Sequence, residues 1–533
     1  MAAKKRTAKL PTTGAAKQFV FAPGQWLAAL AAGGLLGLAS PGFNQWYLAW
    51  FALAPLFLFI YSNNRYIKQI LLAFCFGLAY NLTYLHWYLN LAPLDWLGFT
   101  GIYGYLLAML AWLITATHQA LAFLLFAAIV ARLPLKSSFK LTKKGRGFIN
   151  WPILLLPLLW VLIVNKLGNM PDLMGVPWSM LEYTQYQQPQ LLQCASIIGG
   201  VGICALIVAV NVTIASLVAT TVGKNKFRTI AAENKVTSAF HCLFTAVAAA
   251  LIFTAGYFEE KALPTNDDIV STALVQGGIN IDMQKTVHRF TIEDLLENYN
   301  KLLTEYDCHD QLVVLAEGAL PTYLRDQPGV LNWLKNKAYT KRLDLVLGSM
   351  DLSAAKRPFN AAYGITSGGI VLSEVYHKRF LVPIGEYTPL MVHYLPEWVK
   401  RWTNTPAGGG FAAGKEPVVL ALSSGKVAPL ICFESISPEV TAASCRAGGQ
   451  VLANISDLAW FHKSDCGDQM VAFSVLRSIE NRRYCLFAAN TGPCAIINKS
   501  GRIVQYAGQG DKPVLLGKIG LNSKITTFAQ WFR

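Results

Sequence analysis

The sequence predicts a membrane α-helical bundle followed by an α/β domain. Of its 533 residues, 53% are apolar and 14% are charged, whereas a soluble domain carries about 25% charged residues. Long apolar stretches are confined to the first half, and short β-branched runs alternate with charged segments in the second half. Residues 1–261 contain 19 Lys/Arg against 6 Asp/Glu, and residues 262–533 contain 27 against 24. The net charge of +16 therefore indicates a basic membrane half rather than a nucleic-acid-binding surface.

Seven apolar stretches occupy most of residues 25–261. A helix needs roughly 20 apolar residues to cross about 30 Å of hydrocarbon. The stretches lie at about 25–41, 45–62, 69–90, 102–131, 149–165, 191–222 and 237–258. Buried helices of a large soluble protein would show an amphipathic period and polar faces, which these stretches lack. We therefore expect about seven transmembrane helices.

Basic residues in alternate loops predict the orientation of these helices. The side that carries the basic tail, residues 1–24, has 17 Lys/Arg, and the opposite side has one, Lys166. Because basic loops stay in the cytoplasm, the N-terminus is predicted to be cytoplasmic. An odd number of spans then places residues 262–520 on the outer side of the membrane.

From Ile269 onward the pattern predicts an α/β domain. Strands are expected at 269–277, 311–318, 344–349, 368–374, 426–434, 450–456, 484–490 and 494–498. Helices are expected at 291–306, 332–342 and 468–482. This alternation predicts a sheet whose faces are covered by helices. The sequence has no phosphate-binding glycine motif and no zinc-spaced Cys/His cluster, so we expect neither a cofactor nor a metal.

Three ionisable residues lie where expected strands end. Glu317 closes LVVLAE, Lys378 follows GGIVLSE, and Cys432 ends APLIC. Loops at strand ends are held by the sheet, and catalytic groups gather there. A carboxylate can remove the proton of a thiol nucleophile, and an ammonium can stabilise the resulting oxyanion. Singly, each residue also fits an ordinary strand end or basic patch, but together they predict catalysis through Cys432.

The segment 391–414 combines aromatic and basic residues. Tyr394, Trp398 and Trp402 stand beside Lys400 and Arg401, a mixture that is typical of a membrane interface. A glycine-rich run at its end, GGGFAAG, predicts a flexible hinge. We expect the segment to act as a substrate-binding lid, with an ordinary packed surface helix as the alternative.

The motifs around the three ionisable residues resemble those of a known family. AEGALP, YHKRFLVPIGEYTP and ICFES, in this order, resemble the Glu–Lys–Cys signature of the nitrilase (carbon–nitrogen hydrolase) superfamily. With its N-terminal spans, the chain resembles the apolipoprotein N-acyltransferase family. The resemblance implies that the second half is a nitrilase-like α-β-β-α sandwich. It also implies that Cys432 is the nucleophile, Glu317 the base and Lys378 the oxyanion support, with Glu386 and Glu434 as supporting carboxylates.

The resemblance further implies an acyltransferase of bacterial lipoprotein maturation. Such an enzyme moves a fatty acyl chain from a membrane phospholipid to the N-terminal amine of diacylglyceryl-cysteine in an apolipoprotein, through a thioester on the cysteine. The expected partners are the phospholipid donor, the apolipoprotein acceptor and the lipid bilayer of the bacterial inner membrane, with no nucleic acid. We expect a monomer. Because water competes for a thioester, Phe433 and the 391–414 lid are expected to keep the site apolar.

Two other functions remain open from the sequence. A membrane-tethered nitrilase-type amidase would use the same thioester chemistry, and a non-catalytic lipoprotein-binding homologue would keep only the fold. The chain also departs from the family pattern, with Leu458 and Phe487 at positions where the family has polar residues. Residues 521–533 are expected to form a C-terminal tail, and the family's eighth span is expected to be absent.

Overall fold

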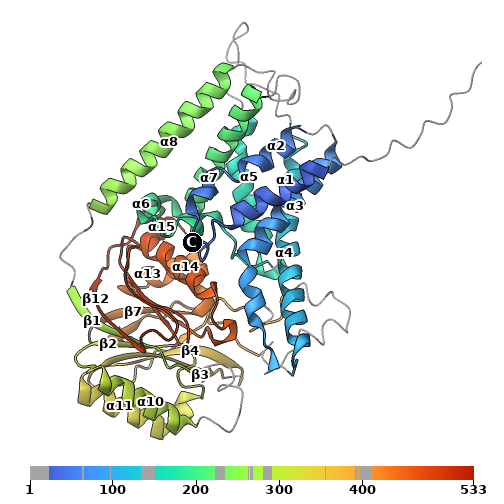
Figure 1. The fold of residues 1–533 in the computed structure, drawn as a ribbon. Coiled ribbons are helices and arrows are strands. Elements are labelled where there is room, and N and C mark those ends of the chain that lie inside the picture. The colour runs from blue at the N-terminus through green and yellow to red at the C-terminus, as the bar shows by residue number, and fades with distance from the viewer. Residues whose placement is uncertain are drawn as a thin grey trace, which may run out of the picture.

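The computed structural model describes residues 23–62, 65–95, 98–133, 151–173, 175–222, 235–261, 263, 268–279, 291–354, 356–383, 385–390, 394 and 410–532. The first half of the chain forms a helical part, and the second half forms a domain with two stacked sheets. The helical part lies against one side of this domain (Figure 1).

Helices occur at each of the seven apolar stretches. They are α1 (Pro23–Gly37), α2 (Ala54–Ser62), α3 (Tyr66–Tyr84), α4 (Ile102–Val130), α5 (Trp151–Trp160), α7 (Ala195–Val222) and α8 (Lys235–Lys261). Within the described ranges, Ile102–Val130 and Ala195–Ala219 are the two helices long and apolar enough to cross a membrane. The predicted bundle of about seven transmembrane helices is therefore not confirmed.

Breaks in the backbone explain part of this difference. The 45–62 stretch divides into a 3₁₀ turn, Trp46–Trp50, and the nine-residue helix α2. The 149–165 stretch contains Pro157 within α5, and the chain then widens into a π-helical turn at Val161–Lys166. Proline removes a helical hydrogen bond, so an apolar stretch need not form one long helix.

The second half contains two six-stranded sheets. The first has the strand order β12-β1-β2-β3-β4-β5, and the second has the order β11-β10-β9-β8-β7-β6. The first sheet is formed by β1 (Asp268–Val275), β2 (Leu312–Leu315), β3 (Asp344–Leu352), β4 (Pro358–Ile365), β5 (Tyr376–His377) and β12 (Val514–Leu521). The second is formed by β6 (Leu420–Leu422), β7 (Gly425–Ile431), β8 (Val451–Ser456), β9 (Cys485–Ala489), β10 (Cys494–Ile497) and β11 (Ile503–Ala507). In both sheets the central strands are parallel and the outer strands are antiparallel.

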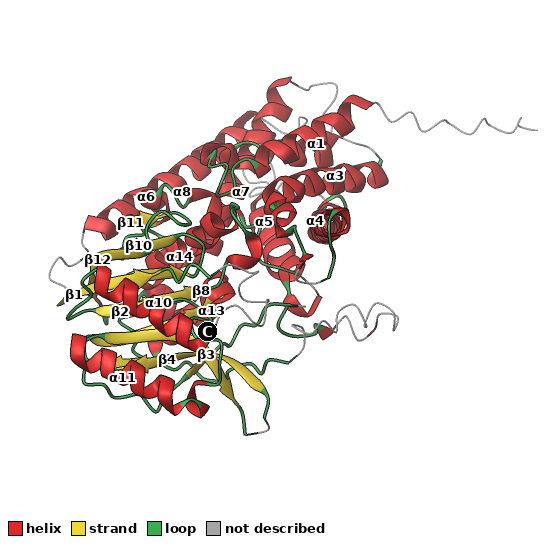
Figure 2. Cartoon of the chain, turned by 60° about the horizontal axis from the view of Figure 1, so that its bottom comes forward, coloured by secondary structure: helices red, strands yellow, loops and turns green. Residues whose placement is uncertain are grey.

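Helices cover the outer faces of the two sheets. Helices α10 (Ile292–Glu305) and α11 (Pro328–Lys341) pack on the first sheet, where their apolar side chains share one core with β1 to β4. Helices α13 (Pro438–Arg446) and α14 (Cys466–Asn481) pack on the second sheet. A separate core joins the two sheets face to face. The domain is thus an α-β-β-α sandwich, and α14 lies between its second sheet and the helical part (Figures 1 and 2).

One predicted strand is wrong, and several elements were not predicted. Residues 368–374 form the turn between β4 and β5, because Gly369 adopts a φ of +74° and its N–H donates to Thr366 O at 2.8 Å. Strand β4 lies just before that turn, and β11 and β12 follow the last expected strand. The C-terminal residues form a short helix, α15 (Thr527–Trp531), and Phe528 of this helix packs on Gly199 of α7.

Candidate active site

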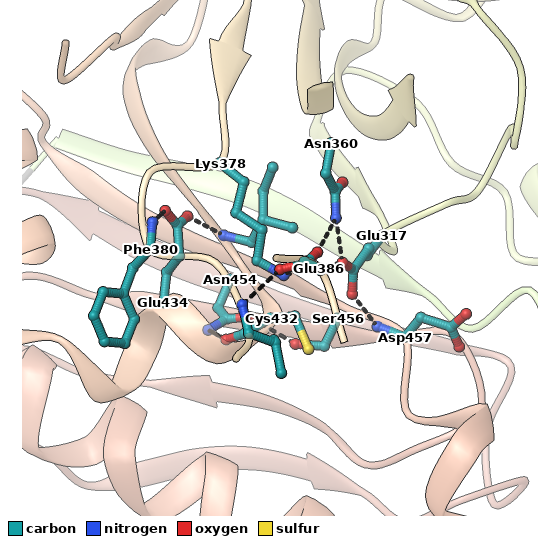
Figure 3. Close-up of polar contacts among 12 residues, drawn as sticks. Glu317, Asn360, Lys378, Phe380, Glu386, Cys432, Glu434, Asn454, Ser456 and Asp457 are labelled. Atoms are coloured by element: carbon teal, nitrogen blue, oxygen red, sulfur yellow. Dashed lines mark hydrogen bonds and ion pairs between the residues drawn. The ribbon is translucent and has the colours of Figure 1, made fainter. Parts of the chain in front are cut away.

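The three predicted catalytic residues follow strands of the two facing sheets. Glu317 comes two residues after β2, Lys378 directly follows β5, and Cys432 directly follows β7. Gly348 of β3 packs under Glu317, since a Cβ atom at this position would lie 2.6 Å from Glu317 Cα. The structure brings the Glu317 and Lys378 side chains together, and Cys432 lies beside them (Figure 3).

Lys378 is a buried ammonium that contacts two carboxylates. Its side chain is 1% exposed, and Nζ lies 2.9 Å from Glu386 Oε1 and 3.5 Å from Glu317 Oε1. Burial alone would lower the pKa of Lys378, but Glu386 and then Glu317 outweigh it and raise the pKa above its usual value. Lys378 therefore remains positively charged at physiological pH.

An amide that the sequence analysis did not identify holds the two carboxylates in place. Asn360 Nδ2 donates to Glu317 Oε1 at 2.7 Å and to Glu386 Oε1 at 3.2 Å. The other oxygens of these carboxylates accept from backbone N–H groups, Glu317 Oε2 from Asp457 at 2.8 Å and Glu386 Oε2 from Val382 at 2.8 Å. Asn360 lies in β4, the strand that was not predicted, so no sequence signal placed it in the site.

Cys432 occupies a strained turn between β7 and a 3₁₀ helix, Cys432–Ile436. Its φ is +53°, a conformation that costs a non-glycine residue about 1 kcal/mol or more. The carbonyl oxygen of Cys432 accepts from Asn454 Nδ2 at 3.1 Å and from Ser435 Oγ at 3.3 Å. Burial, and next the charge of Glu317, raise the pKa of the Cys432 thiol, whereas Lys378 lowers it. Burial and Glu317 thus favour the protonated form of the thiol.

Glu434 joins the loop that carries Lys378 to the loop that carries Cys432. Its carboxylate is fully buried and accepts four hydrogen bonds. The donors are Arg379 N at 2.6 Å, Ile431 N at 2.7 Å, Tyr376 Oη at 2.8 Å and Phe380 N at 3.0 Å. Burial raises the pKa of Glu434, and these hydrogen bonds oppose the rise. Glu434 therefore holds the backbone just before Cys432 against the backbone just after Lys378.

The predicted apolar residues of the site have different environments. Phe433 is 5% exposed and lies between two nearly parallel rings, Trp178 at 6.0 Å and Phe380 at 5.4 Å. Trp178 comes from the helical part and was not predicted. Tyr394 is 81% exposed, and Trp398 and Trp402 lie outside the described residues.

The described end of the predicted hinge is held by backbone hydrogen bonds. Ala412 N donates to Pro358 O at 2.8 Å, and Gly414 N donates to Lys378 O at 2.7 Å. A side chain at Gly414 would collide with the backbone of His377. Residues 412–414 therefore pack against β4 and the loop that carries Lys378, because glycine permits this close approach. Residues 408–409 lie outside the described residues, and the flexible hinge stays a prediction.

Two family models match this chain in succession. The apolipoprotein N-acyltransferase N-terminal domain matches residues 32–213, and the carbon–nitrogen hydrolase domain matches residues 271–527. An apolipoprotein N-acyltransferase from Geobacter metallireducens is 29% identical over 93% of this chain and 89% of its own length. One from Synechocystis sp. is 27% identical over 93% of this chain and 95% of its own length. Among solved structures, an amidase from Nesterenkonia sp. aligns with 51% of this chain and 96% of its own, with 17% identity and a TM-score of 0.36.

Proposed function

We propose, from the premise that this chain belongs to the apolipoprotein N-acyltransferase family, that Glu317, Lys378 and Cys432 carry out its reaction. The enzyme transfers a fatty acyl chain from a membrane phospholipid to the N-terminal amine of the diacylglyceryl-cysteine of an apolipoprotein. The observation that carries the assignment of residues is the buried Lys378 ammonium, held between Glu317 and Glu386 beside the strand-end Cys432.

The first half-reaction forms a thioester on Cys432. Glu317 accepts the thiol proton, and the thiolate attacks the ester carbonyl of the phospholipid. The Lys378 ammonium stabilises the oxyanion of the tetrahedral intermediate. When the ester C–O bond breaks, the departing glycerol oxygen takes the proton from Glu317, and a lysophospholipid leaves.

The second half-reaction transfers the acyl chain to the amine. The lipoprotein amine attacks the thioester, and Glu317 accepts a proton from the attacking nitrogen. The C–S bond then breaks, and the Cys432 sulfur recovers its proton from Glu317. The product amide is less reactive than the thioester, so the transfer is driven forward.

Asn360 and Glu434 position the reacting groups. The Asn360 amide keeps the Glu317 and Glu386 carboxylates at fixed distances from Lys378. The four hydrogen bonds of Glu434 keep the Lys378 loop against the Cys432 loop. Neither role requires contact with the substrate.

Membrane placement is the second part of the proposal. Seven spans would bring both lipid-anchored substrates to the site by lateral diffusion, with the N-terminus in the bacterial cytoplasm and residues 268–532 outside. Two long apolar helices and the basic loops support this topology.

Thiol labelling tests this topology. A Gly145→Cys variant should react with an impermeant thiol reagent only after the inner membrane is permeabilised, whereas an Asn336→Cys control on α11 should react in cells with an opened outer envelope. Labelling of residue 145 without permeabilisation of the inner membrane would reverse the orientation.

The 391–414 segment forms the third part of the proposal. Tyr394 is 81% exposed, which suits a residue that contacts lipid. We assign to Tyr394, Trp398 and Trp402 the contact with the bilayer. Residues 412–414, later in the sequence, pack on β4 and the Lys378 loop. The catalytic unit is proposed to be a monomer that binds one phospholipid or one acceptor at a time.

Intact-protein mass spectrometry tests the mechanism. With phospholipid and no acceptor, the enzyme should gain one fatty acyl adduct that neutral hydroxylamine removes. Cys432→Ser should carry no adduct, whereas the matched variant Cys445→Ser, at another buried cysteine, should still carry it. Asn360→Ala should slow adduct formation by roughly tenfold or more because two charge-assisted hydrogen bonds are lost, and the exposed control Asn336→Ala should not. An active enzyme without an adduct, or with one on another cysteine, would contradict the mechanism.

A further inference from the structure

A cavity of about 250 Å³ lies where the helical part meets the sandwich domain. Its walls come from residues 165–183, from α7 and α14, from the turn after Cys432 and from the C-terminal residues. The described lining residues do not include Glu317, Lys378 or Cys432. The cavity therefore lies beside the catalytic site and is not part of it.

Several buried polar atoms of the cavity wall have no hydrogen-bond partner among the described residues. They are Asn165 Nδ2, Asn169 Oδ1, Glu182 Oε2, Glu480 Oε2, Arg477 Nε and Arg477 Nη1. Arg477 Nη2 donates to Glu480 Oε1 at 3.2 Å, whereas Arg477 Nε lies 3.2 Å from Glu480 Oε2 without the geometry of a hydrogen bond. Arg477 is 2% exposed, Glu480 is 1% exposed and Glu182 is 4% exposed. Because buried polar groups are nearly always hydrogen-bonded, this cluster indicates a polar occupant.

The polar atoms determine the chemistry of that occupant. Glu182 Oε2 and Glu480 Oε2 each lack a donor, and two carboxylates beside one guanidinium favour a cation. The Nε and Nη1 groups of Arg477 still require an acceptor, for which a phosphate is the strongest partner. A phosphate ester that carries a primary ammonium meets both requirements in one small group.

The surroundings of the cavity match a lipid. Met170, Met180 and Phe528 give its wall an apolar portion. At its rim, Lys166 Nζ lies 3.4 Å from Glu439 Oε1 across the junction of the two halves. One and two turns before Lys166, Leu162 is 51% exposed and Leu158 is 54% exposed. These side chains form an apolar track that leads from the rim along the helical part.

We propose that this cavity binds the headgroup of a resident phospholipid with a primary ammonium, which the acyl-transfer reaction does not consume. Glu182 and Glu480 bind the ammonium, Arg477 and Lys166 bind the phosphate, and the acyl tails lie along Leu158 and Leu162. The lipid joins the helical part to the sandwich domain, because its ligands come from both. The proposal goes beyond the acyl transfer described above, since it concerns a lipid that does not reach Cys432.

Lipid retention by the full chain tests this site. The protein is delipidated in detergent, incubated with one phospholipid and passed through gel filtration, and the retained lipid per chain is measured by mass spectrometry. Phosphatidylethanolamine offers N–H donors, phosphatidylcholine has the same charges without N–H donors, and phosphatidylglycerol has no cation. We expect retention of phosphatidylethanolamine with about tenfold higher affinity than either of the others, the value of one charge-assisted hydrogen bond.

Variants separate this site from the catalytic site. Val201→Trp fills the cavity without removing a charge and should abolish retention, whereas Ile198→Trp, on the same helix outside the cavity, should not. Glu182→Gln should reduce the preference for phosphatidylethanolamine over phosphatidylcholine. Cys432→Ser should retain the lipid fully, so a failure of the thioester mechanism would not affect this result. Equal retention of the three lipids, retention by Val201→Trp, or a cavity that binds water alone would overturn the proposal.

Discussion

The Cys432 thiol lies near two opposite charges that have opposite effects on it. Burial raises its pKa above the ordinary value of 9.0, the negative charge of Glu317 raises it further, and the positive charge of Lys378 lowers it. Glu317 therefore disfavours a standing thiolate, although in the proposed reaction it accepts the thiol proton. This arrangement protects the nucleophile from oxidation and alkylation between turnovers, because the thiolate is the reactive form.

Loss of the Glu317 charge should therefore speed the alkylation of Cys432 and slow catalysis. In Glu317→Gln the neighbouring negative charge is lost, so the thiol pKa falls and iodoacetamide should label Cys432 faster at pH 8 than in the wild type. The same variant should lose acyl transfer, because the amide cannot accept a proton. In the wild type the labelling rate should rise with pH and reach its midpoint above 9.0. Slower labelling of Glu317→Gln at pH 8 would contradict this electrostatic account.

At the level of single residues, the sequence located the proposed catalytic groups but not the side chains that contact them. Glu317, Lys378 and Cys432 could be identified because each has a distinctive motif at a strand end. Asn360 and Trp178 could not, since they contact the site only through the packing of distant segments. The roles given to Tyr394, Trp398 and Trp402 stay predictions.

At the scale of secondary-structure elements, the parallel strands were predicted best. Buried central strands are continuous apolar runs, and such runs are distinct from their polar connections. The strand predicted at 368–374 is wrong because an apolar run, GGIVL, is not always a strand. This segment turns at Gly369, where φ is +74°. The half-exposed β11 and β12 lack a continuous apolar run, so the sequence pattern did not reveal them.

The close packing of β3 under Glu317 gives a test at this scale. A Cβ atom at Gly348 would lie 2.6 Å from Glu317 Cα and 2.7 Å from Ala316 O, and both neighbours are backbone atoms. Gly348→Ala should therefore displace Glu317, reduce the rate of adduct formation and destabilise the protein by about 1–3 kcal/mol. Gly329→Ala in α11, where an added Cβ meets nothing within 4 Å, is the matched control and should be neutral or slightly stabilising. Wild-type activity in Gly348→Ala would contradict this prediction, because β3 could then shift away from Glu317 without displacing it.

At the scale of the whole molecule, the two halves share one buried junction. Gln469 of α14 donates to Pro41 O at 3.2 Å and to Tyr84 O at 3.1 Å, and it accepts from Trp178 Nε1. Trp178 in turn stacks on Phe433, next to the nucleophile. The sequence predicted that the chain has two halves, but contacts between residues 255 or more positions apart have no local pattern. The position of the helical part relative to the nucleophile could therefore come only from the structure.

Glu480 makes this junction sensitive to pH. It accepts from Gly200 N of α7 at 2.8 Å and lies beside Arg477, Glu182 and Glu439. Burial raises the pKa of Glu480 from its usual 4.5 to about 7, against the opposing effects of Arg477 and the Gly200 N–H. The folded state therefore binds the proton of the Glu480 carboxyl more tightly than the unfolded state does. The stabilisation that protonated Glu480 gives is complete below pH 4.5 and is lost as the pH rises through about 7.

Glu480→Gln should therefore reduce the pH dependence of stability in lipid-free detergent. The glutamine keeps an oxygen that can accept from Gly200 N but has no proton to lose. The wild-type melting temperature should fall between pH 5 and 8, with a free-energy change of the order of 3 kcal/mol, and the variant should fall less steeply. Some slope should remain, because burial also raises the pKa of Glu182. Glu439→Gln, at the half-exposed rim of the same junction, should reduce the slope less than Glu480→Gln does, because the charge of Glu439 is only a minor cause of the raised Glu480 pKa. Equal slopes in the wild type and Glu480→Gln would mean that Glu480 keeps its charge across this range, and the junction would then owe its stability to the Arg477 ion pair.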